Sequence, residues 1–437
     1  MAPSSTKQQF IQAPGMSKSR VVITGLGVVA PNGVGIEEFW RNAIAGVSGI
    51  EGYDWGHKVF GFKSRVMGRV KNFDPASHGI TERQRAGHGR YLQFALAAAR
   101  MAVKDARLAT EALDRSRFGV SIASAIADAA AMESNLLLLT DNGRSPVDPD
   151  WVGEGSFDAF DFGLAASVLA QQYGADGSVS NLSTGCTAGL DALGFAMERI
   201  RNGEADVMLA GASEAPLCPL SIGSFEALGA LSTRAVDEAQ RASTPFSAER
   251  DGFVIAEGCG ILVLESLEHA QRRGATIYAE LAGYASVNNA YHMTDLPPEG
   301  EALARCIQLA LADAGCSTED IDHISAHGSS TVQNDANETG AIKAVFGARA
   351  PSIAINSLKS MTGHALAAAN AVESVALSLE IKHQQVHPTI NYRVADPECD
   401  LDYVPNHARA SRISHALKLS SGFSGIHSVI VMRALES

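Results

Sequence analysis

The sequence predicts an α/β protein in which a strand, turn and helix unit occurs twice. Runs of β-branched residues alternate with alanine-rich segments of helical pattern along the chain, which is typical of a sheet covered by helices. The alternation starts afresh near residue 275, after the basic helix end HAQRRG. With 437 residues, 46% of them hydrophobic, the chain can bury a large core in one or two closely packed domains.

The first predicted strand covers residues 20–30 (RVVITGLGVVA), a β-branched run of the kind that lies buried in a sheet. A dinucleotide-binding strand has a similar composition, but it needs a G-x-G-x-x-G turn. Gly25 and Gly27 have no third glycine in register, so the nucleotide alternative is disfavoured. Residues 1–19 are polar and lack the apolar region of a secretory signal. We expect them to form a loose tail, with Met16 as an alternative start.

The remaining elements follow in order along the chain, and their patterns alternate between the two types. Helices are predicted at 91–105, 190–201 and 302–314, and strands at 118–123, 207–210, 260–264, 277–285, 321–326 and 429–432.

The repeat is clearest in residues 178–196 and 352–376, which both run from a strand through a polar, glycine-containing turn into an alanine-rich helix. Superposing Gly185 on Gly363 places Cys186 opposite His364. In a duplicated fold with a pseudo-twofold axis, the two turns meet, so that one half supplies a nucleophile and the other a base. Every α/β protein contains several such units, and the echo alone leaves duplication open.

Composition excludes several classes of function. Lys and Arg number 35 against 48 Asp and Glu, for a net charge of -13, so nucleic-acid binding is not expected. The alanine-rich segments are interrupted by charge before they could span a bilayer. The scattered cysteines form no C-x-x-C pair and no zinc spacing, which predicts a reduced, cytoplasmic protein without a metal; they are Cys186, Cys218, Cys259, Cys306, Cys316 and Cys399.

Cys186, in the turn STGCTAGL, is the candidate nucleophile. It precedes a predicted helix, whose unsatisfied N–H groups and dipole favour a thiolate and can bind an oxyanion. The ordinary alternative for a free cysteine is a small buried apolar residue. The other five cysteines lack this setting and are expected to pack in the core.

Two histidines follow apparent strand ends in polar turns, His327 in SAHGSST and His364 in KSMTGHA. Loops at strand ends are where catalytic groups concentrate in α/β folds. Lys359 and Glu373 flank His364 in the sequence and could lie behind it as a pair, although a solvated lysine and a surface glutamate are the ordinary alternatives.

The last glycine-rich turn (LSSGFSGIHS) contains Phe423 between Gly422 and Gly425. The glycines suggest a close backbone approach, with the Phe423 N–H directed into a site. A hairpin turn with a core phenylalanine is the alternative.

With these motifs in place, the chain resembles the beta-ketoacyl synthases, or condensing enzymes, from about residue 20 to its end. Their active-site cysteine, H-G-T-G-T, K-S-x-x-G-H and glycine-rich C-terminal motifs occur here in the family's order, which argues against chance agreement. The positions that match the family's functional residues are Cys186, His327, Lys359, His364, Glu373 and Phe423.

Three further segments, 289–294, 333–339 and 396–405, resemble the alpha ketosynthase subunit of type II polyketide synthases more than the fatty-acid enzymes. The partner subunit of these systems, the chain-length factor, lacks the nucleophilic cysteine, so Cys186 places the chain on the catalytic side.

The sequence also departs from the family pattern. H-G-T-G-T reads H-G-S-S-T, so Ser329 keeps a hydroxyl while Ser330 replaces a glycine, and Ser424 replaces another glycine in the C-terminal loop. The helix around Glu373 (AAANAVES) is closer to the fatty-acid enzymes. The class of product is therefore left open.

The resemblance implies the thiolase fold, an α/β architecture of two pseudo-symmetric halves in five α-β-α-β-α layers. It divides the chain into a flexible tail (1–19), a half that carries the nucleophile (20–272) and a half that carries both histidines (273–437).

The implied reaction is the decarboxylative Claisen condensation of malonyl-acyl carrier protein with an acyl chain held on the Cys186 thiolate. His327 and His364 would assist decarboxylation and stabilise the enolate. Lys359, held by Glu373, would orient the histidines and keep their protonation correct.

The N–H groups of Cys186 and Phe423 would bind the thioester oxyanion, and Ser329 and Thr331 would line the pantetheine channel. No metal or organic cofactor is expected, because the substrates ride on the phosphopantetheine of an acyl carrier protein. Carrier proteins are acidic, so a local basic patch is required; its candidates are Lys63, Arg65, Arg69 and Lys71.

The resemblance further implies a heterodimer with a chain-length factor, with residues 132–142 (MESNLLLLTDN) at the interface unless their leucines belong to the subunit's own core. Three alternatives remain. A fatty-acid synthase of the same fold would form homodimers, and a non-catalytic subunit would lack Cys186. A degradative thiolase would need a second catalytic cysteine in the C-terminal half, but Cys399 lies away from the glycine-rich turn.

Overall fold

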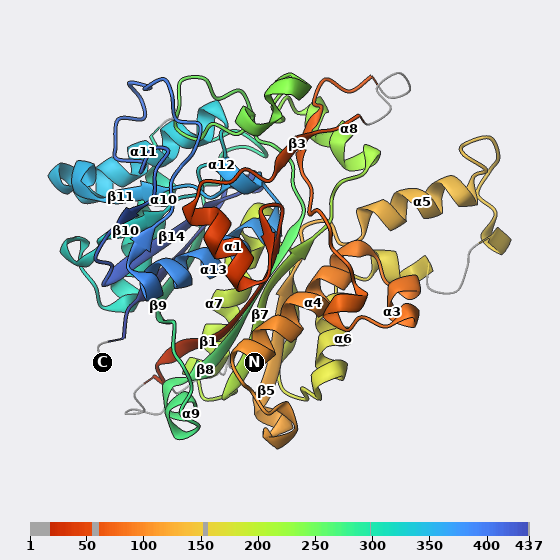
Figure 1. Cartoon of the computed structure of the whole chain (residues 1–437), viewed down its shortest axis with the longest axis horizontal. Coiled ribbons are helices and arrows are strands. Elements are labelled where there is room, and N and C mark those ends of the chain that lie inside the picture. The colour runs from red at the N-terminus through yellow and green to blue at the C-terminus, as the bar shows by residue number, and fades with distance from the viewer. Residues whose placement is uncertain (1–17, 55–60, 152–155, 298, 436–437) are drawn as a thin grey trace, which may run out of the picture.

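The computed structural model describes residues 18–54, 61–151, 156–297 and 299–435 (Figure 1). Within these ranges one mixed sheet of 11 strands runs in the order β11-β10-β14-β15-β9-β1-β8-β7-β5-β6, with β2 beside β1. Its strands are β1 (Val21–Ala30), β2 (Gly33–Val34), β5 (Phe118–Ala123), β6 (Val179–Leu182), β7 (Val207–Glu214), β8 (Gly258–Ser266), β9 (Ala279–Asn288), β10 (His323–Ser325), β11 (Ala354–Asn356), β14 (His415–Ser421) and β15 (Ile426–Arg433).

The sheet consists of two sets of five strands with the same pairing. In the set β6-β5-β7-β8-β1 the first two pairs are parallel and the next two antiparallel. The set β11-β10-β14-β15-β9 repeats this pattern pair by pair. The sets join where β1 runs antiparallel to β9. The matching topology supports the duplication that the sequence echo left open, and the predicted division at residue 272 falls between α9 (Leu267–Arg272) and β9.

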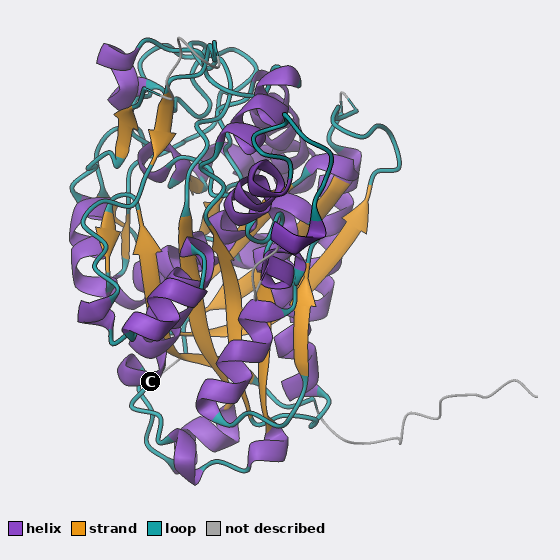
Figure 2. Ribbon diagram, turned by 90° about the vertical axis from the view of Figure 1, so that its right-hand side faces the viewer, coloured by secondary structure: helices purple, strands orange, loops and turns teal. Residues whose placement is uncertain are grey.

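Helices form three layers around the strands. Helices α7 (Ala188–Arg201) and α13 (Ala367–His383) pack on each other and contact strands of both sets. Helices α4 (Arg90–Asp105) and α6 (Leu164–Tyr173) cover the outer face of the first set, and α10 (Glu301–Ala314) covers that of the second, with α11 (Val332–Phe346) against it. Figure 2 shows the strands in the middle of the molecule with helices on both sides. The five α-β-α-β-α layers that the resemblance implied are thereby present.

The two central helices approach closely because they are rich in alanine and glycine. A Cβ on Gly189 of α7 would lie 2.4 Å from the carbonyl oxygen of Ala367 in α13, so only glycine fits there. Enclosed on all sides, α13 is buried from Ala367 to Ile381. This helix therefore joins the two halves.

The predicted elements are all present, with bounds that differ by a few residues. The largest extension is in β7, which continues through Ser213 and Glu214. Both residues are fully buried polar groups, which lie beyond the apolar run that predicted a strand at 207–210. The shorter elements are β3 (Ile50–Gly52), β4 (Val66–Gly68), β12 (Gln385–Val386), β13 (Arg409–Ala410), α1 (Ile36–Ile44), α3 (Glu82–Gly87), α8 (Pro219–Ala227) and α12 (Lys359–Thr362).

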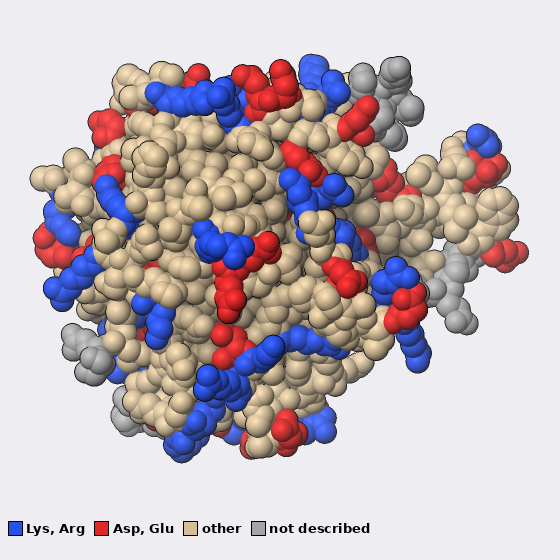
Figure 3. All heavy atoms as spheres, viewed as in Figure 1, with Lys and Arg blue, Asp and Glu red and all other residues tan. Residues whose placement is uncertain are grey.

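Helix α5 (Ala129–Leu139) projects from the body of the molecule (Figure 1). Leu136, Leu137 and Leu138 are 56%, 44% and 55% exposed. The leucine run therefore does not belong to the core of this chain. On the face of the molecule that Figure 3 shows, the basic side chains of Lys and Arg are interspersed with the acidic side chains of Asp and Glu.

Candidate active site

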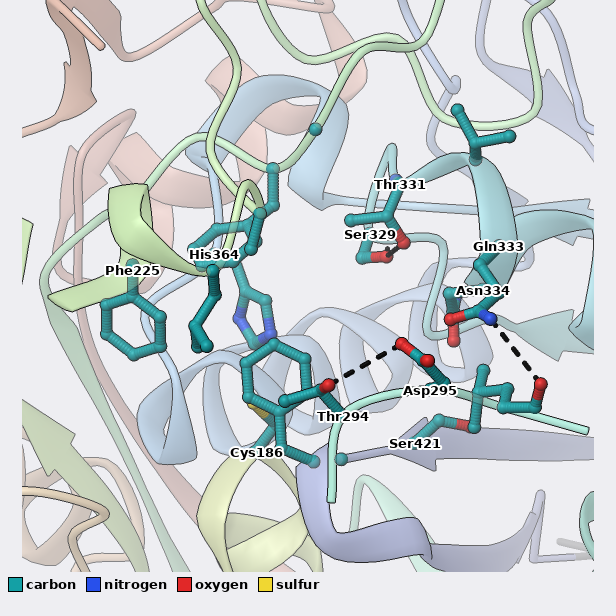
Figure 4. Close-up of a pocket in the computed structure, with 18 of the residues that line it drawn as sticks. Cys186, Phe225, Thr294, Asp295, Ser329, Thr331, Gln333, Asn334, His364 and Ser421 are labelled. Atoms are coloured by element: carbon teal, nitrogen blue, oxygen red, sulfur yellow. Dashed lines mark hydrogen bonds between the residues drawn. The ribbon is translucent and has the colours of Figure 1, made fainter. Parts of the chain in front are cut away.

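A cavity of about 290 Å³ opens between the two halves and collects most of the candidate residues (Figure 4). Cys186 comes from the first half, and two histidines and the glycine-rich C-terminal turn come from the second. The candidates that line it are Cys186, His327, Ser329, Thr331, His364 and Phe423.

Cys186 lies in a single 3₁₀ turn, Gly185–Thr187, that leads directly into α7. The backbone N–H groups of Phe423 and of Cys186 itself are directed at the thiol. Phe423 follows Gly422, whose Cα side faces the Cys186 turn, because a Cβ built there would lie 3.4 Å from the Cys186 nitrogen, an ordinary contact distance. Two backbone donors therefore converge on the Cys186 side chain, where such N–H groups are able to stabilise negative charge.

The expected thiolate is not found. Burial raises the pKa of the Cys186 thiol to about 11, although the Lys359 charge and the two N–H donors lower it. The expectation of a low pKa considered only the helix terminus and omitted desolvation, which disfavours the charged form and is the larger effect here. Cys186 is therefore a thiol at neutral pH and needs a base to react.

The two histidines meet edge to face beside Cys186. Their ring centroids are 5.2 Å apart with an interplanar angle of 79°, and both side chains are buried. His327 follows β10, and His364 follows α12. The backbone N–H of His364 donates a hydrogen bond to the Val254 carbonyl oxygen at 2.7 Å. Burial and the Lys359 charge hold both histidine pKa values well below the usual range. Both rings are therefore neutral at physiological pH and able to accept or donate a proton.

Lys359 and Glu373 form a buried pair behind the histidines. The Lys359 Nζ lies 2.6 Å from Glu373 Oε1 and 2.8 Å from the His327 carbonyl oxygen. Both side chains are 1% exposed, which excludes the alternatives of a solvated lysine and a surface glutamate. The pair fixes the backbone of the His327 turn.

Sequence reasoning missed two buried charged residues around this pair. The Lys418 Nζ lies 2.8 Å from Glu373 Oε2. Glu338 accepts hydrogen bonds from the N–H groups of His327 at 2.6 Å and Gly328 at 2.8 Å, and burial raises its pKa to about 7. Glu338 lies in the 333–339 segment, whose resemblance to the alpha ketosynthase subunits gave it no role in the site. Lys418 is a single lysine in a strand of mostly apolar and serine residues.

The departures from the family motifs are accommodated locally. Ser330 has a positive φ of 70°, and its Oγ accepts the N–H of Thr244 at 2.9 Å. Ser424 also has a positive φ, 65°. The retained hydroxyls of Ser329 and Thr331 lie 2.9 Å apart on the cavity wall (Figure 4). The loop conformation that glycines would favour is thus kept.

The remaining candidates lie away from the cavity. All six cysteines are free, and those other than Cys186 do not line the pocket. Two of the four basic candidates share one counter-ion, because Arg69 and Lys71 both pair with Glu51, at 2.8 and 3.2 Å, which leaves a net positive charge on the three side chains. Within the described ranges, no cluster of three potential metal ligands occurs and no helix is long and apolar enough to cross a bilayer.

Comparisons with known protein families match both halves of the chain. Residues 18–270 match the family described as beta-ketoacyl synthase, N-terminal domain, and residues 278–393 match its C-terminal domain. The tetracenomycin polyketide synthase ketoacyl synthase alpha subunit of Streptomyces glaucescens is 42% identical over 420 residues, 95% of this chain and 97% of that protein. The 3-oxoacyl-[acyl-carrier-protein] synthase 2 of Staphylococcus aureus (strain COL) is 40% identical over 423 residues, covering 96% and 99%.

Two solved structures are similar over nearly their whole length. One is AntDE:AntF, a type II PKS acyl-carrier protein in complex with its ketosynthase bound to the hexaketide, with 63% identity and a TM-score of 0.91 over 96% of this chain and 100% of that one. The other is the ishigamide ketosynthase/chain length factor, with 34% identity and a TM-score of 0.86 over 96% and 100%.

Proposed function

The chain belongs to the beta-ketoacyl synthase family, and we propose that it is the condensing subunit of a type II polyketide synthase. It joins malonyl-acyl carrier protein to an acyl chain on Cys186 by decarboxylative Claisen condensation. The observation that carries the proposal is the convergence of Cys186, His327, His364 and the Phe423 N–H on one cavity. The similarity to an alpha ketosynthase subunit and to a carrier-bound ketosynthase supports the polyketide class.

The first step is transfer of the acyl chain to Cys186. The thiol gives its proton to a neutral pocket histidine while sulfur attacks the carrier thioester, because a thiol of pKa about 11 does not ionise unaided. The N–H groups of Cys186 and Phe423 stabilise the tetrahedral oxyanion. The carbon to sulfur bond of the phosphopantetheine then breaks, and its thiol leaves with the proton.

The second step breaks the bond between the malonyl carboxylate and its α-carbon, and carbon dioxide leaves. The electron pair forms an enolate, whose oxygen accepts hydrogen bonds from the neutral rings of His327 and His364. The enolate carbon attacks the Cys186 thioester, and collapse of the oxyanion breaks the bond between the carbonyl carbon and the cysteine sulfur. Cys186 leaves as a thiolate, which carries the negative charge of the former malonyl carboxylate and then takes a proton from solvent. Lys359 and Glu373 touch neither reactant and act by fixing the His327 turn.

The substrates arrive on the phosphopantetheine of an acyl carrier protein, with Ser329 and Thr331 on the channel wall. The basic candidates for carrier docking are Lys63, Arg65, Arg69 and Lys71, of which Arg69 and Lys71 share the single carboxylate of Glu51 and keep a net positive charge.

A heterodimer with a chain-length factor is supported by the similarity to the ishigamide ketosynthase/chain length factor and by the exposed leucines of α5. A homodimeric fatty-acid synthase is the second candidate, favoured by 40% identity to the Staphylococcus aureus enzyme. Intact-mass analysis of carrier-bound products, made by the purified enzyme from malonyl carrier protein with and without a ketoreductase, separates the two. Several successive two-carbon extensions that leave ketones, or only partly reduced positions, in the chain support the polyketide function, whereas extension that proceeds only after each unit is reduced to a saturated chain contradicts it.

A further inference from the structure

Lys418 is a fully buried lysine in the middle of β14, outside the cavity. Its Nζ lies 2.8 Å from Glu373 Oε2 and donates to the carbonyl oxygens of Ala326 at 3.1 Å and Leu419 at 2.6 Å. Ala326 is the residue directly before His327. The ammonium group therefore links the segment between β10 and His327 to the helix that carries Glu373.

This contact completes a buried chain of charges. The Oε1 atom of Glu373 contacts the ammonium group of Lys359, and its Oε2 atom contacts that of Lys418. One carboxylate therefore faces two ammonium groups. Each lysine also holds a carbonyl at the His327 turn, Lys359 that of His327 and Lys418 that of Ala326. The turn is thus clamped from two directions by groups that share one counter-ion.

We propose that Lys418 is a positioning residue for malonyl decarboxylation, which fixes the His327 turn and contributes to the charge state of the histidine pair. This inference rests on the proposed condensing function. Lys418 touches no reactant, and its effect passes through Glu373 and the two histidines.

The charges around the histidines give the sign of the effect. Burial and the Lys359 charge lower the pKa of both rings, and the Lys418 charge adds to this. The groups that face Lys418 are Glu373 from α13, Lys359 from α12 and Glu338 from α11, and His427 of β15 also faces His327. Burial lowers the pKa of Lys418 itself, whereas its two glutamate neighbours raise it.

Removing the Lys418 charge should therefore raise the pKa of the histidines, so that they protonate at a higher pH. Lys418→Met keeps the apolar stem and removes the charge, and Lys418→Gln keeps a hydrogen-bond donor without charge. Leu417→Ala is the matched control, because Leu417 is buried in the same strand and points to the opposite face of the sheet. This control loosens packing without changing any charge near the site.

The experiment uses the purified enzyme in its assembled form. It measures the decarboxylation of malonyl-acyl carrier protein between pH 5.5 and 8.5, and the transfer of an acyl group from carrier protein to Cys186. For Lys418→Met we expect the acid limb of decarboxylation to move to higher pH, because the Lys418 charge lowers the pKa of both histidines. Its rate should fall up to about a hundredfold relative to acyl transfer. Lys418→Gln should show the same pH shift with a smaller loss of rate, and it carries the test if Lys418→Met does not fold. Leu417→Ala should lower the Tm without a pH shift.

Two results together would overturn the inference by showing that Lys418 only packs. In both Lys418 variants, the ratio of the decarboxylation rate at pH 5.5 to that at pH 7.5 would equal the wild-type ratio, and decarboxylation and acyl transfer would lose activity equally. Failure of the wild-type enzyme to decarboxylate malonyl carrier protein at any pH would instead contradict the proposed function.

Discussion

The side-chain amide of Asn370 donates a hydrogen bond to the carbonyl oxygen of Cys186. Asn370 lies on α13 in the second half of the chain, whereas Cys186 lies in the first. Glu373 follows one turn later on the same helix. A single buried helix thus holds both the nucleophile's turn and the counter-ion of the two buried lysines, which couples the placement of the nucleophile to that of the histidines.

Replacing Cys186 with alanine should abolish condensation, because no other cysteine lines the cavity. In the wild-type enzyme, an acyl carrier protein substrate should leave its acyl group on the Cys186 peptide, which peptide mass spectrometry detects. Cys259→Ala is the matched control and should retain activity, since Cys259 is a core residue of β8. An adduct on Cys218 or Cys259 would overturn the assignment.

Removing either histidine should separate the two partial reactions. His327→Ala and His364→Ala should suppress malonyl decarboxylation by about a hundredfold or more, whereas acyl transfer to Cys186 survives in part because the N–H donors remain. Carbon dioxide release and radiolabel transfer, measured on the same preparations, check this. Full condensation by one variant would remove that histidine from the mechanism.

Glu373→Gln should strongly destabilise the fold, because the two buried lysines, Lys359 and Lys418, would lose the one carboxylate that contacts both. Breaking a buried charge cluster in this way costs about 3–5 kcal/mol of unfolding free energy, measured by urea denaturation. Glu82→Gln is the control, since Glu82 pairs with Arg85 on the surface and its loss should change stability little. Equal stabilities of the two variants would contradict the buried charge chain.

Glu214 predicts a pH dependence of stability. Its Oε1 accepts hydrogen bonds from Ser124 Oγ and the Ala125 N–H, and burial raises its pKa from 4.5 to about 8. The raised value favours the protonated carboxyl in the folded state. The stabilisation is therefore complete below pH 4.5 and is lost as the pH rises through 8.

Glu214→Gln mimics the protonated acid and removes this loss. The stability of the variant relative to the wild type should rise by a few kcal/mol between pH 5 and pH 8, at about 1.36 kcal/mol per pKa unit. Urea unfolding at the two pH values measures the difference, and exposed Glu37→Gln serves as the control. A difference that stays constant with pH would show that Glu214 is ionised in the folded protein.

The leucines of α5 predict an assembly interface. Leu136→Asp with Leu138→Asp should leave the circular dichroism spectrum unchanged but prevent dimer formation in light scattering, because both side chains are more than half exposed. Leu309→Asp, at a comparably exposed position on α10, should not affect assembly. A dimer that withstands the double change would place the interface elsewhere.

Expression of the chain alone tests the identity of the partner. A stable, fully active homodimer would contradict the heterodimer, whereas insoluble or inactive protein rescued by a homologue that lacks the cysteine would support it.

Residues within short motifs could be identified from the sequence, and isolated buried charges could not. Cys186, His327, His364 and Phe423 each lie in a turn with glycine or hydroxyl neighbours, and the structure brings all four to one cavity. Lys418 had no such signal, because a lone lysine in a strand resembles a solvent-facing position until the fold places a carboxylate beside it. The prediction of a low pKa for the Cys186 thiol was wrong for a related reason. A helix terminus is visible in the sequence, but the burial around it is not.

The strands and helices of the fold could be predicted from local sequence, whereas the way they pair could not. Buried strands such as β1 have continuous apolar sequences, and their bounds were found within a few residues. The pairing of the strands depends on contacts between distant segments, so the repeat suggested two halves without showing that β1 and β9 join them into one sheet.

The central place of β1 has a consequence during synthesis on the ribosome. All ten residues of this strand are buried in the finished fold, yet apart from the two-residue β2 its partners are β8 and β9, and the bond from Thr24 to Glu265 spans 241 residues. At roughly 5–20 residues per second, translation leaves the strand without a partner for about ten to fifty seconds. The nascent chain is therefore expected to engage chaperones until β8 emerges.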